Sequence, residues 1–257
     1  MNTRINKTKK IGVIGCGYWG TIITKSLINL GYKNIYVFDS TFGNSLTLKK
    51  KFKQISIIKN YRQMLINPEI ESLFYATPPS KNFKLIKSAL KYDKKIFLEK
   101  PGVITSSDFK KLIRINKIYK RKIMVGYVYC FNNFIQYIKK VLVKKKLGKI
   151  LYVNFQRQNL GPIRNDVDVT YDLSSHDLSI ILYLFKKIPK KLSHINYPIL
   201  NKKISDISNL HLKLGNIFID INCSWLNPTK VRKIIIIGSK KMLLFDEMNL
   251  EDPIKIY

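Results

Sequence analysis

Three glycines near the N-terminus are spaced in a way that favours phosphate binding. Gly15, Gly17 and Gly20 form a G-x-G-x-x-G pattern that follows an apolar run at residues 10–14 and opens a helical stretch at 19–30. In such a turn the first glycine permits the tight bend, the second lets a pyrophosphate approach the backbone, and the third lets helix and strand pack closely. The N–H groups of the helix N-terminus then face the phosphates. The residues of this predicted dinucleotide-binding loop are Gly15, Gly17, Tyr18, Trp19 and Gly20.

A carboxylate follows at the position where such a fold binds the adenosine ribose. Asp39 ends the strand-like run at 34–39, 19 residues after Gly20, and an acid at this point hydrogen-bonds the ribose hydroxyls. The same acid repels a 2′-phosphate, so the expected cofactor is NAD, with NADP disfavoured. The alternative is a chance glycine turn followed by an unrelated acid. Strand, loop, helix and acid nevertheless occur in the required order, which favours dinucleotide binding.

Two short motifs follow later strand-like runs. The runs at 71–77 and 95–99 end in a T-P and an E-K-P motif, and parallel sheets bind their ligands at the carboxyl ends of the strands. A strand that simply stops at prolines explains the first motif equally well. Lys100, fixed between a strand-end acid and a proline, is a candidate to polarise or protonate a substrate oxygen. The residues predicted to line the cofactor here are Thr77, Pro78, Glu99 and Lys100.

An acid and a histidine four residues apart offer acid–base chemistry. Asp172 and His176 lie at the start of a helical stretch near 174–186, and on a helix this spacing gives them a common face. Histidine suits the removal of a proton from an alcohol because it titrates near neutral pH. Asp172 would bind a hydroxyl or orient a partner. The structural alternative is that Asp172, Ser174 or Ser175 is a plain helix N-cap and His176 a half-buried helix residue.

The elements that position these residues alternate along the first half of the chain. Alternation of strands and helices is typical of a parallel sheet covered by helices on both faces. We therefore predict an α/β fold, with a Rossmann-type doubly wound parallel sheet, for an NAD-binding domain at residues 1–122. The strands are expected at 10–15, 34–39, 71–77, 95–99 and 122–127, and the helices near 19–30, 45–52, 81–92 and 107–119.

The pattern changes beyond residue 123. A basic helix near 134–146, a long strand at 149–157 and the helix near 174–186 are followed by segments that are mostly strand-like. Successive strands imply an antiparallel or mixed sheet. We therefore predict a second, α+β domain at residues 123–257 that binds the substrate. Its later strands are expected at 211–214, 217–225, 231–238 and 242–245.

The net charge is high, but it does not by itself indicate a nucleic-acid or membrane function. The 47 basic and 16 acidic residues give a formal charge of +31, which would attract polyanions. The chain also holds 40 Lys, 39 Ile and 21 Asn against 2 Ala. These three abundant types belong to A/T-rich codons, so drift in base composition explains all three excesses, whereas a nucleic-acid interface explains only the lysines. We expect no specific nucleic-acid partner.

The sequence also disfavours membrane, disulfide and metal sites. No apolar run approaches the ~18–20 residues that a membrane span needs, and the polar N-terminus has no signal core, so we expect a cytoplasmic protein without a membrane partner. Cys16, Cys130 and Cys223 are too far apart for a disulfide framework or a zinc site, and no metal is expected. His194 and His211 have no partner at a telling sequence spacing and are interpreted as structural.

Three ordered motifs support a resemblance to a known family. The glycine loop, the E-K-P motif and the D-x-x-x-H segment resemble the Gfo/Idh/MocA family of sugar and inositol oxidoreductases over nearly the whole chain. The resemblance implies hydride transfer between a sugar hydroxyl or keto group and NAD, with Lys100, His176 and Asp172 as the catalytic residues. Either His176 or Lys100 would take the hydroxyl proton, and both redox directions are compatible with these residues.

Within the family, residues 159–166 and the D-x-x-x-H segment are similar to a branch from surface-polysaccharide pathways that oxidises nucleotide-linked sugars. The resemblance therefore implies a small-molecule partner, a sugar or nucleotide sugar. The two arginines near this segment would each bind a diphosphate or carboxylate through two guanidinium nitrogens. The alternative is that they are surface charges without a binding role. The substrate-binding residues predicted here are Arg157, Arg164 and Tyr127, with Tyr129 and Asn154 as further candidates by position.

The chain departs from the family pattern in two respects. Family members often carry Asn and Arg where this chain has Ile22 and Lys25, and they usually continue for some tens of residues past residue 257. We therefore expect an incomplete second domain whose uncovered apolar surface favours a homo-oligomer. The alternative is a truncated, non-catalytic homologue that only binds a dinucleotide.

We predict that the charge of the chain gives only non-specific binding to polyanions. Counterion release makes such binding fall steeply with salt and ignore the base sequence. Fluorescence anisotropy with two DNA duplexes of unrelated sequence, at rising NaCl, measures both properties. Tight binding of one duplex that persists near physiological salt would contradict this interpretation of the lysines.

Overall fold

The chain divides into two compact units. The computed structural model describes residues 7–161, 163, 167–200 and 203–257, and the units are Met1–Gly126 and Tyr127–Tyr257. The boundary expected after residue 122 precedes strand β6 (Ile123–Val125), which pairs with the sheet of the first unit. Among the described residues, no helix is long and apolar enough to cross a membrane.

The first unit contains a six-stranded parallel sheet in the order β3-β2-β1-β4-β5-β6. The strand order reverses between β1 and β4, which is the point where doubly wound sheets bind dinucleotides. The strands are β1 (Lys10–Ile14), β2 (Ile35–Phe38), β3 (Ser56–Ile57), β4 (Ile70–Tyr75), β5 (Lys95–Leu98) and β6. The helices are α1 (Tyr18–Asn29), α2 (Phe42–Lys51), α3 (Tyr61–Ile66), α4 (Pro79–Ala89) and α5 (Ser106–Tyr119).

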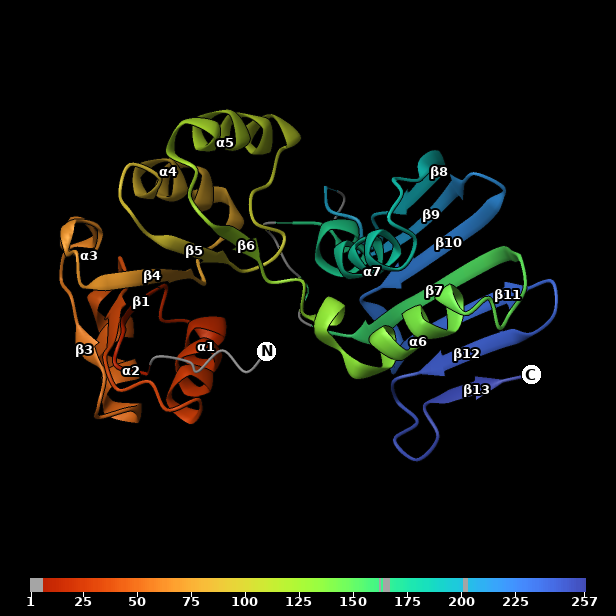
Figure 1. Ribbon diagram of the computed structural model, residues 1–257, viewed down its shortest axis with the longest axis horizontal. Coiled ribbons are helices and arrows are strands. Elements are labelled where there is room, and N and C mark those ends of the chain that lie inside the picture. Colours follow the sequence, from red (N-terminus) through yellow and green to blue (C-terminus); the bar gives the residue numbers. More distant parts are fainter. Residues whose placement is uncertain (1–6, 162, 164–166, 201–202) are drawn as a thin grey trace. The chain divides into compact units, whose positions relative to one another are not determined.

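Both faces of this sheet are buried beneath helices, because successive strand residues point to opposite faces. On β1, Val13 belongs to a core with Leu27 of α1 and Leu48 of α2, whereas the next residue, Ile14, belongs to a core with Ile86 of α4. Figure 1 shows α4 and α5 on one side of the sheet and α1 and α2 on the other. The predicted doubly wound fold is confirmed.

The second unit contains a seven-stranded mixed sheet in the order β13-β12-β11-β7-β10-β9-β8. Its central strand β7 is parallel to β10 and antiparallel to β11, and the other pairs are antiparallel. The predicted α+β class is therefore confirmed. The strands are β7 (Ile150–Leu160), β8 (Lys190–Tyr197), β9 (Ile207–Leu214), β10 (Ile217–Ser224), β11 (Leu226–Gly238), β12 (Met242–Asp246) and β13 (Ile254–Ile256). The helices are the 3₁₀ helix η1 (Val128–Phe131), α6 (Asn133–Val143), the π-helical turn η2 (Thr170–Ser174) and α7 (Ser175–Phe185).

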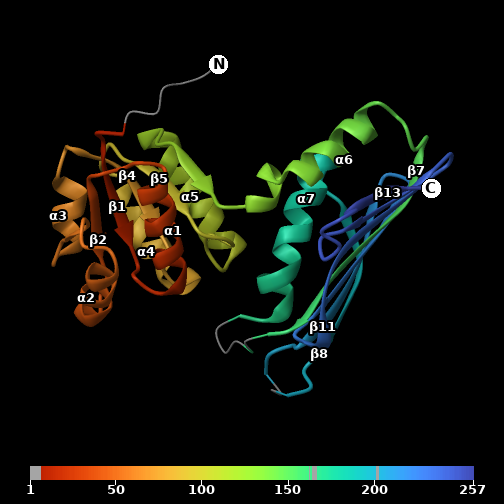
Figure 2. The ribbon, with the colours of Figure 1, turned by 90° about the horizontal axis from the view of Figure 1, so that it is seen from below.

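Helices α6 and α7 cover one face of this sheet, as Figure 2 shows. The core between them holds the buried side chains of Phe155 on β7, Ile138 on α6 and Ile181 on α7. Residues that alternate with Phe155 point to the opposite face. Asn154 is one of them, and its amide donates to the side chain of Asn222 at 3.0 Å. Asn154 therefore lies on the face away from α7, whereas the sequence made it a candidate for the substrate pocket.

Candidate active site

The loop between β1 and α1 has the geometry that the glycine pattern predicts. Gly15 has a positive φ of 94°, which glycine adopts at low cost. A Cβ on Gly20 would lie 1.8 Å from the carbonyl oxygen of Gly15, whereas a Cβ on Gly17 would meet no atom of the described residues within 4 Å. The third glycine thus lets the helix pack against the loop, and the second borders open space that a pyrophosphate can enter. The loop therefore fits a dinucleotide.

Helix α1 begins directly after this loop. Gly17 occupies the N-cap position, and because glycine has no side chain to cap the helix, the first N–H groups are left for a phosphate. Tyr18 and Trp19 are the first two helical residues, and both are exposed. Their rings meet edge to face, with centroids 5.4 Å apart. Both residues thus lie at the helix end that would hold the phosphates.

Asp39 lies just after β2 and is hydrogen-bonded to the glycine loop. Its Oδ2 accepts from the backbone N–H of Cys16 at 2.7 Å, and its Oδ1 accepts from the N–H of Thr41 at 2.8 Å and the amide of Asn44 at 3.3 Å. The carboxylate therefore joins the ends of β1 and β2, where this fold binds the adenosine ribose. Burial raises the pKa of the Cys16 thiol to about 11, so this cysteine stays protonated and unreactive.

Asn82 joins the loops that follow β4 and β5. It lies on α4, is fully buried, accepts from the hydroxyl of Thr77 and donates to the carbonyl of Gly102. Because Gly102 comes two residues after Lys100, this amide fixes the T-P and E-K-P motifs relative to each other. Pro78 is the N-cap residue of α4. Sequence reasoning missed Asn82, since the only signal is a polar residue on an apolar helix face.

The E-K-P motif forms a tight turn at the end of β5. The N–H of Glu99 donates to the carbonyl of Tyr75 at 2.9 Å, and the carbonyl of Glu99 accepts from the N–H of Gly102 at 3.0 Å. Burial raises the pKa of the Glu99 carboxyl, and a hydrogen bond from the backbone of Lys100 opposes this rise. The half-buried Lys100 is thereby held at the carboxyl edge of the sheet.

Asp172 and His176 lie on one continuous helical segment, Asp172 in η2 and His176 in the first turn of α7. Single π-helical turns often occur at functional sites. The indole N–H of the almost fully buried Trp225 donates to Oδ2 of Asp172 at 3.3 Å and so orients the carboxylate. Just before this turn, Oδ1 of Asp168 accepts from the N–H of Tyr171 at 2.9 Å. Of the three N-cap candidates, Ser174 takes the N-cap position of α7 without a side-chain capping bond, and Asp172 lies inside η2.

Arg157 has a different role from the one expected from the sequence. The side chain is buried, and its guanidinium binds the equally buried Asp177 through Nε, at 3.0 and 3.2 Å, and through Nη2, at 2.7 Å. Nη1 donates to the hydroxyl of Tyr129 at 2.9 Å. Burial opposes the charge of Arg157, but the carboxylate of Asp177 holds the pKa of Arg157 above its usual value. We therefore assign Arg157 to the interior of the second unit and not to substrate binding.

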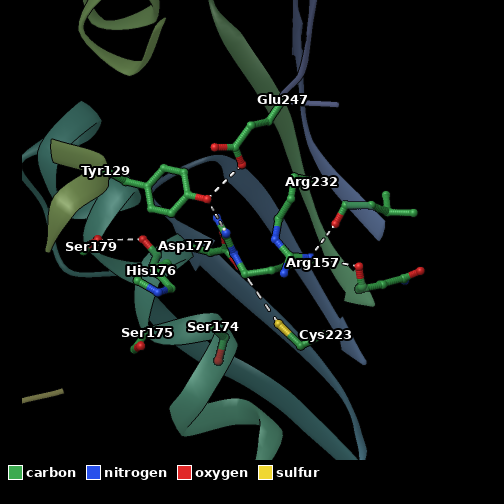
Figure 3. Close-up of polar contacts among 12 residues, drawn as sticks. Tyr129, Arg157, Ser174, Ser175, His176, Asp177, Ser179, Cys223, Arg232 and Glu247 are labelled. Atoms are coloured by element: carbon green, nitrogen blue, oxygen red, sulfur yellow. Dashed lines mark hydrogen bonds and ion pairs between the residues drawn. The ribbon is translucent and has the colours of Figure 1, made fainter. Parts of the chain in front are cut away.

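A cluster of polar side chains surrounds this ion pair, as Figure 3 shows. The hydroxyl of Tyr129 donates to Oε2 of Glu247 at 2.8 Å. Arg232 lies beside Arg157 on the neighbouring strand, and burial together with the charge of Arg157 lowers the pKa of Arg232. The imidazole of His176 meets the Tyr129 ring edge to face, with centroids 5.2 Å apart. His176 therefore borders a charge-balanced cluster with a buried ion pair at its centre.

The remaining predicted residues do not extend this cluster. Arg164 lies outside the described residues, so its substrate contact stays a prediction. Tyr127 immediately precedes η1, and burial raises the pKa of its hydroxyl. His194 shares a hydrogen bond with the hydroxyl of Ser208 on β9, and His211 shares one with the carboxylate of Asp220 on β10. Among the described residues, no group of three or more His, Cys, Asp or Glu side chains could hold a metal ion.

The doubly wound sheet, the glycine loop and the strand-end acid define a dinucleotide-binding Rossmann domain. Residues 9–127 match the sequence profile GFO_IDH_MocA, described as an oxidoreductase family with an NAD-binding Rossmann fold. On this evidence the first unit is an NAD-binding Rossmann domain similar to that of the Gfo/Idh/MocA oxidoreductases, and its cofactor is NAD. The resemblance inferred from the glycine loop and the E-K-P motif is confirmed for this unit, and the D-x-x-x-H segment lies beyond the matched residues.

The chain is similar to several known dehydrogenases, in sequence to one and in fold to two others. Inositol 2-dehydrogenase of Salmonella typhimurium is 20% identical over 186 residues, which are 70% of this chain and 55% of that protein. UDP-N-acetylglucosamine 3-dehydrogenase GnnA from Acidithiobacillus ferrooxidans superposes with a TM-score of 0.82 at 18% identity, covering 96% of this chain and 79% of that one. The scyllo-inositol dehydrogenase of Lactobacillus casei, solved with NAD(H) and scyllo-inositol, gives 0.84 at 19% identity, covering 96% and 81%. The chain spans about half the length of the curated relatives it matches.

We expect alanine to cause different defects at two glycines of the loop. Gly20→Ala places a Cβ 1.8 Å from a backbone oxygen, so it should lower the melting temperature and abolish NAD binding. Gly17→Ala should fold normally but weaken NAD binding, because its Cβ occupies the path of the pyrophosphate. Gly43→Ala, whose Cβ also meets no described atom within 4 Å, is the matched control. Thermal unfolding and calorimetric titration with NAD measure these effects, and unchanged NAD affinity in Gly17→Ala would refute the loop assignment.

Asp39 is expected to set the preference for NAD over NADP. Its carboxylate repels a 2′-phosphate, so Asp39→Ala should narrow the difference in affinity between the two cofactors. Asn44→Ala, which removes one side-chain contact of Asp39 but keeps the carboxylate, should preserve the preference. Titration calorimetry with both cofactors provides the measurement. Equal affinities in the unmodified protein would show that Asp39 does not discriminate.

Proposed function

We propose that the protein is an NAD-dependent dehydrogenase that transfers a hydride between a secondary hydroxyl of a nucleotide-linked sugar and nicotinamide. The observation that carries this proposal is the oriented pair of Asp172 and His176. The carboxylate is oriented by Trp225 and the imidazole packs against Tyr129. A fixed acid and histidine in an NAD-binding oxidoreductase match the needs of alcohol oxidation, which releases one proton for each hydride.

In this proposal, residues of the chain accept the hydroxyl proton and bind the substrate oxygen. The glycine loop and Asp39 would hold NAD, which would supply the hydride acceptor for the carbinol carbon. His176 accepts the hydroxyl proton, since imidazole titrates near neutral pH. As the resemblance implies, we assign to Lys100 the polarisation of a substrate oxygen through its ammonium group, which would stabilise the developing negative charge. Asp172 orients the sugar through a neighbouring hydroxyl, and in the reverse direction His176 returns the proton to the carbonyl oxygen.

Two considerations support a nucleotide sugar as the substrate class. The similar structures include enzymes named for UDP-N-acetylglucosamine and for scyllo-inositol, which both present ring carbons with secondary hydroxyls. The D-x-x-x-H segment and the residues just after β7 also resemble the branch of the family that acts on nucleotide-linked sugars. We therefore expect a sugar carried on a diphosphate to be preferred.

The proposal is tested by NADH formation from NAD with a panel of UDP-sugars and inositols. Turnover of UDP-sugars alone is the expected result. Turnover of inositols alone would keep the dehydrogenase activity but overturn the substrate class. Binding of NAD without turnover of any compound, in either redox direction, would instead support the non-catalytic, dinucleotide-binding alternative.

Removal of the proposed acid–base groups should lower the rate without affecting the cofactor. Removing a general acid or base typically costs ~10²–10⁴ in rate, so Lys100→Met and His176→Ala should each lower kcat by about that factor while NAD affinity is kept. Asp172→Asn should raise KM or lower kcat. The double variant of Lys100 and His176 should be less impaired than the product of the single effects, because groups that act as a unit are not additive.

Two matched substitutions control for charge and residue type. Lys95→Met removes an exposed lysine that pairs with Glu71 in the same unit, and His211→Ala removes a histidine from the sheet face away from α7. Both should retain full kcat. If His176→Ala also retains full kcat, this histidine is structural and the assignment fails.

A further inference from the structure

The ring of Tyr129 packs against the imidazole of His176. The two rings come from different helices, η1 and α7, and meet at an interplanar angle of 68° with centroids 5.2 Å apart. This is the edge-to-face arrangement that aromatic pairs prefer. An imidazole held in this way has fewer orientations than one in open solvent, because the Tyr129 ring occupies the space on one side of it.

Tyr129 is itself held firmly through its hydroxyl. The oxygen accepts from Nη1 of Arg157 at 2.9 Å, and the O–H donates to Oε2 of Glu247 at 2.8 Å. The guanidinium carbon of Arg157 also lies 4.5 Å from the centre of the ring. The single proton of this hydroxyl is already donated to a carboxylate, so Tyr129 is not placed to give a proton to a substrate.

The same arginine also fixes the backbone of His176. Its other edge binds Asp177, the residue that directly follows His176 in α7. Arg157 of the sheet thus reaches His176 by two routes, through the helix backbone at Asp177 and through the ring of Tyr129 (Figure 3). Glu247, which comes from the segment after β12, holds the hydroxyl from a third direction.

We propose that Tyr129 is a positioning residue that sets the orientation of the His176 imidazole for proton transfer, with Arg157 and Glu247 as its anchors. The kinetic part of this inference rests on the function proposed above. Proton transfer requires the base within hydrogen-bond reach of the hydroxyl, and a misplacement of about 1 Å can lower a rate ~10²-fold. The orientation of the imidazole itself is a property of the second unit and can be measured without any substrate.

The orientation is read directly from the NMR signals of the imidazole ring. The chain has three histidines, so the His176 protons are assigned by their absence in His176→Ala. An aromatic ring shifts the resonances of protons near it, and Tyr129→Leu should therefore move the His176 signals, whereas Tyr129→Phe, which keeps the ring, should largely preserve them. Tyr61→Leu is the matched control, because Tyr61 is a partly buried tyrosine of the first unit whose hydroxyl is also hydrogen-bonded. It should leave the His176 signals in place.

The rate of the proposed reaction provides the second measurement. Tyr129→Leu should lower kcat about 10²-fold with little change in KM, and Tyr129→Phe should recover most of this loss. In the His176→Ala background, Tyr129→Leu should cause no further loss of kcat, since a residue that acts through His176 has nothing left to position. An equal loss in both backgrounds would mean a general structural role and would overturn the proposal.

A second pair of variants covers the case in which Tyr129→Leu does not fold. Glu247→Leu removes an anchor of the hydroxyl but keeps the ring, and it should shift the His176 signals and lower kcat less than Tyr129→Leu. Glu247→Gln, which retains an acceptor oxygen, should restore both. Unmoved His176 signals in Tyr129→Leu or, where that variant does not fold, in Glu247→Leu would refute the positioning role. If the unmodified protein turns over no sugar, the proposed function fails, and the comparison of the His176 signals in Glu247→Leu and Glu247→Gln, which both keep the Tyr129 ring, still tests the positioning role.

Discussion

The ion pair between Arg157 and Asp177 determines how the candidate site of the second unit is built. Both side chains are buried, and the guanidinium binds the carboxylate through two nitrogens. Removing one partner from a buried pair leaves an uncompensated charge at a cost of about 3–5 kcal/mol. The pair ties the start of α7 to β7, and therefore fixes the segment that carries Asp172 and His176. The groups that would act on a substrate are thus positioned by charges that do not touch it.

The first unit positions its ligand by backbone geometry instead. The positive φ of Gly15, the contact between Gly15 and Gly20, and the open space beside Gly17 define a phosphate-binding loop that depends little on side chains. Asp39 is the one side chain that ties this loop to the next strand. A chain whose surface has drifted toward lysine and isoleucine can therefore keep its dinucleotide site, because few of the affected side chains take part in it.

Local spacing in the sequence was sufficient to predict the architecture and the cofactor. The glycine loop, Asp39 and the alternation of strands and helices are formed by residues close together in the chain. The spacing of the apolar residues among them indicates directly which elements they form. The short strand β3, the short helix α3 and the exposed strand β8 were missed, because two to eight residues without an apolar period give no such signal.

Contacts between distant segments could not be predicted in this way. Arg157 was interpreted as a substrate ligand, since nothing in its neighbourhood of the sequence shows that Asp177, 20 residues later, would occupy its guanidinium. The same holds for the indole of Trp225 beside Asp172, 53 residues apart. Because β7 lies at the centre of its sheet, folding of this sheet also depends on contacts between distant segments. Strand β7 lies between two antiparallel three-stranded meanders, β8–β10 and β11–β13, and its contacts span long stretches of chain, as between Tyr152 and Asp220, 68 positions apart. Loop-closure entropy must be lost before such contacts form, so we expect the rate of sheet formation to be set by the docking of both meanders on β7.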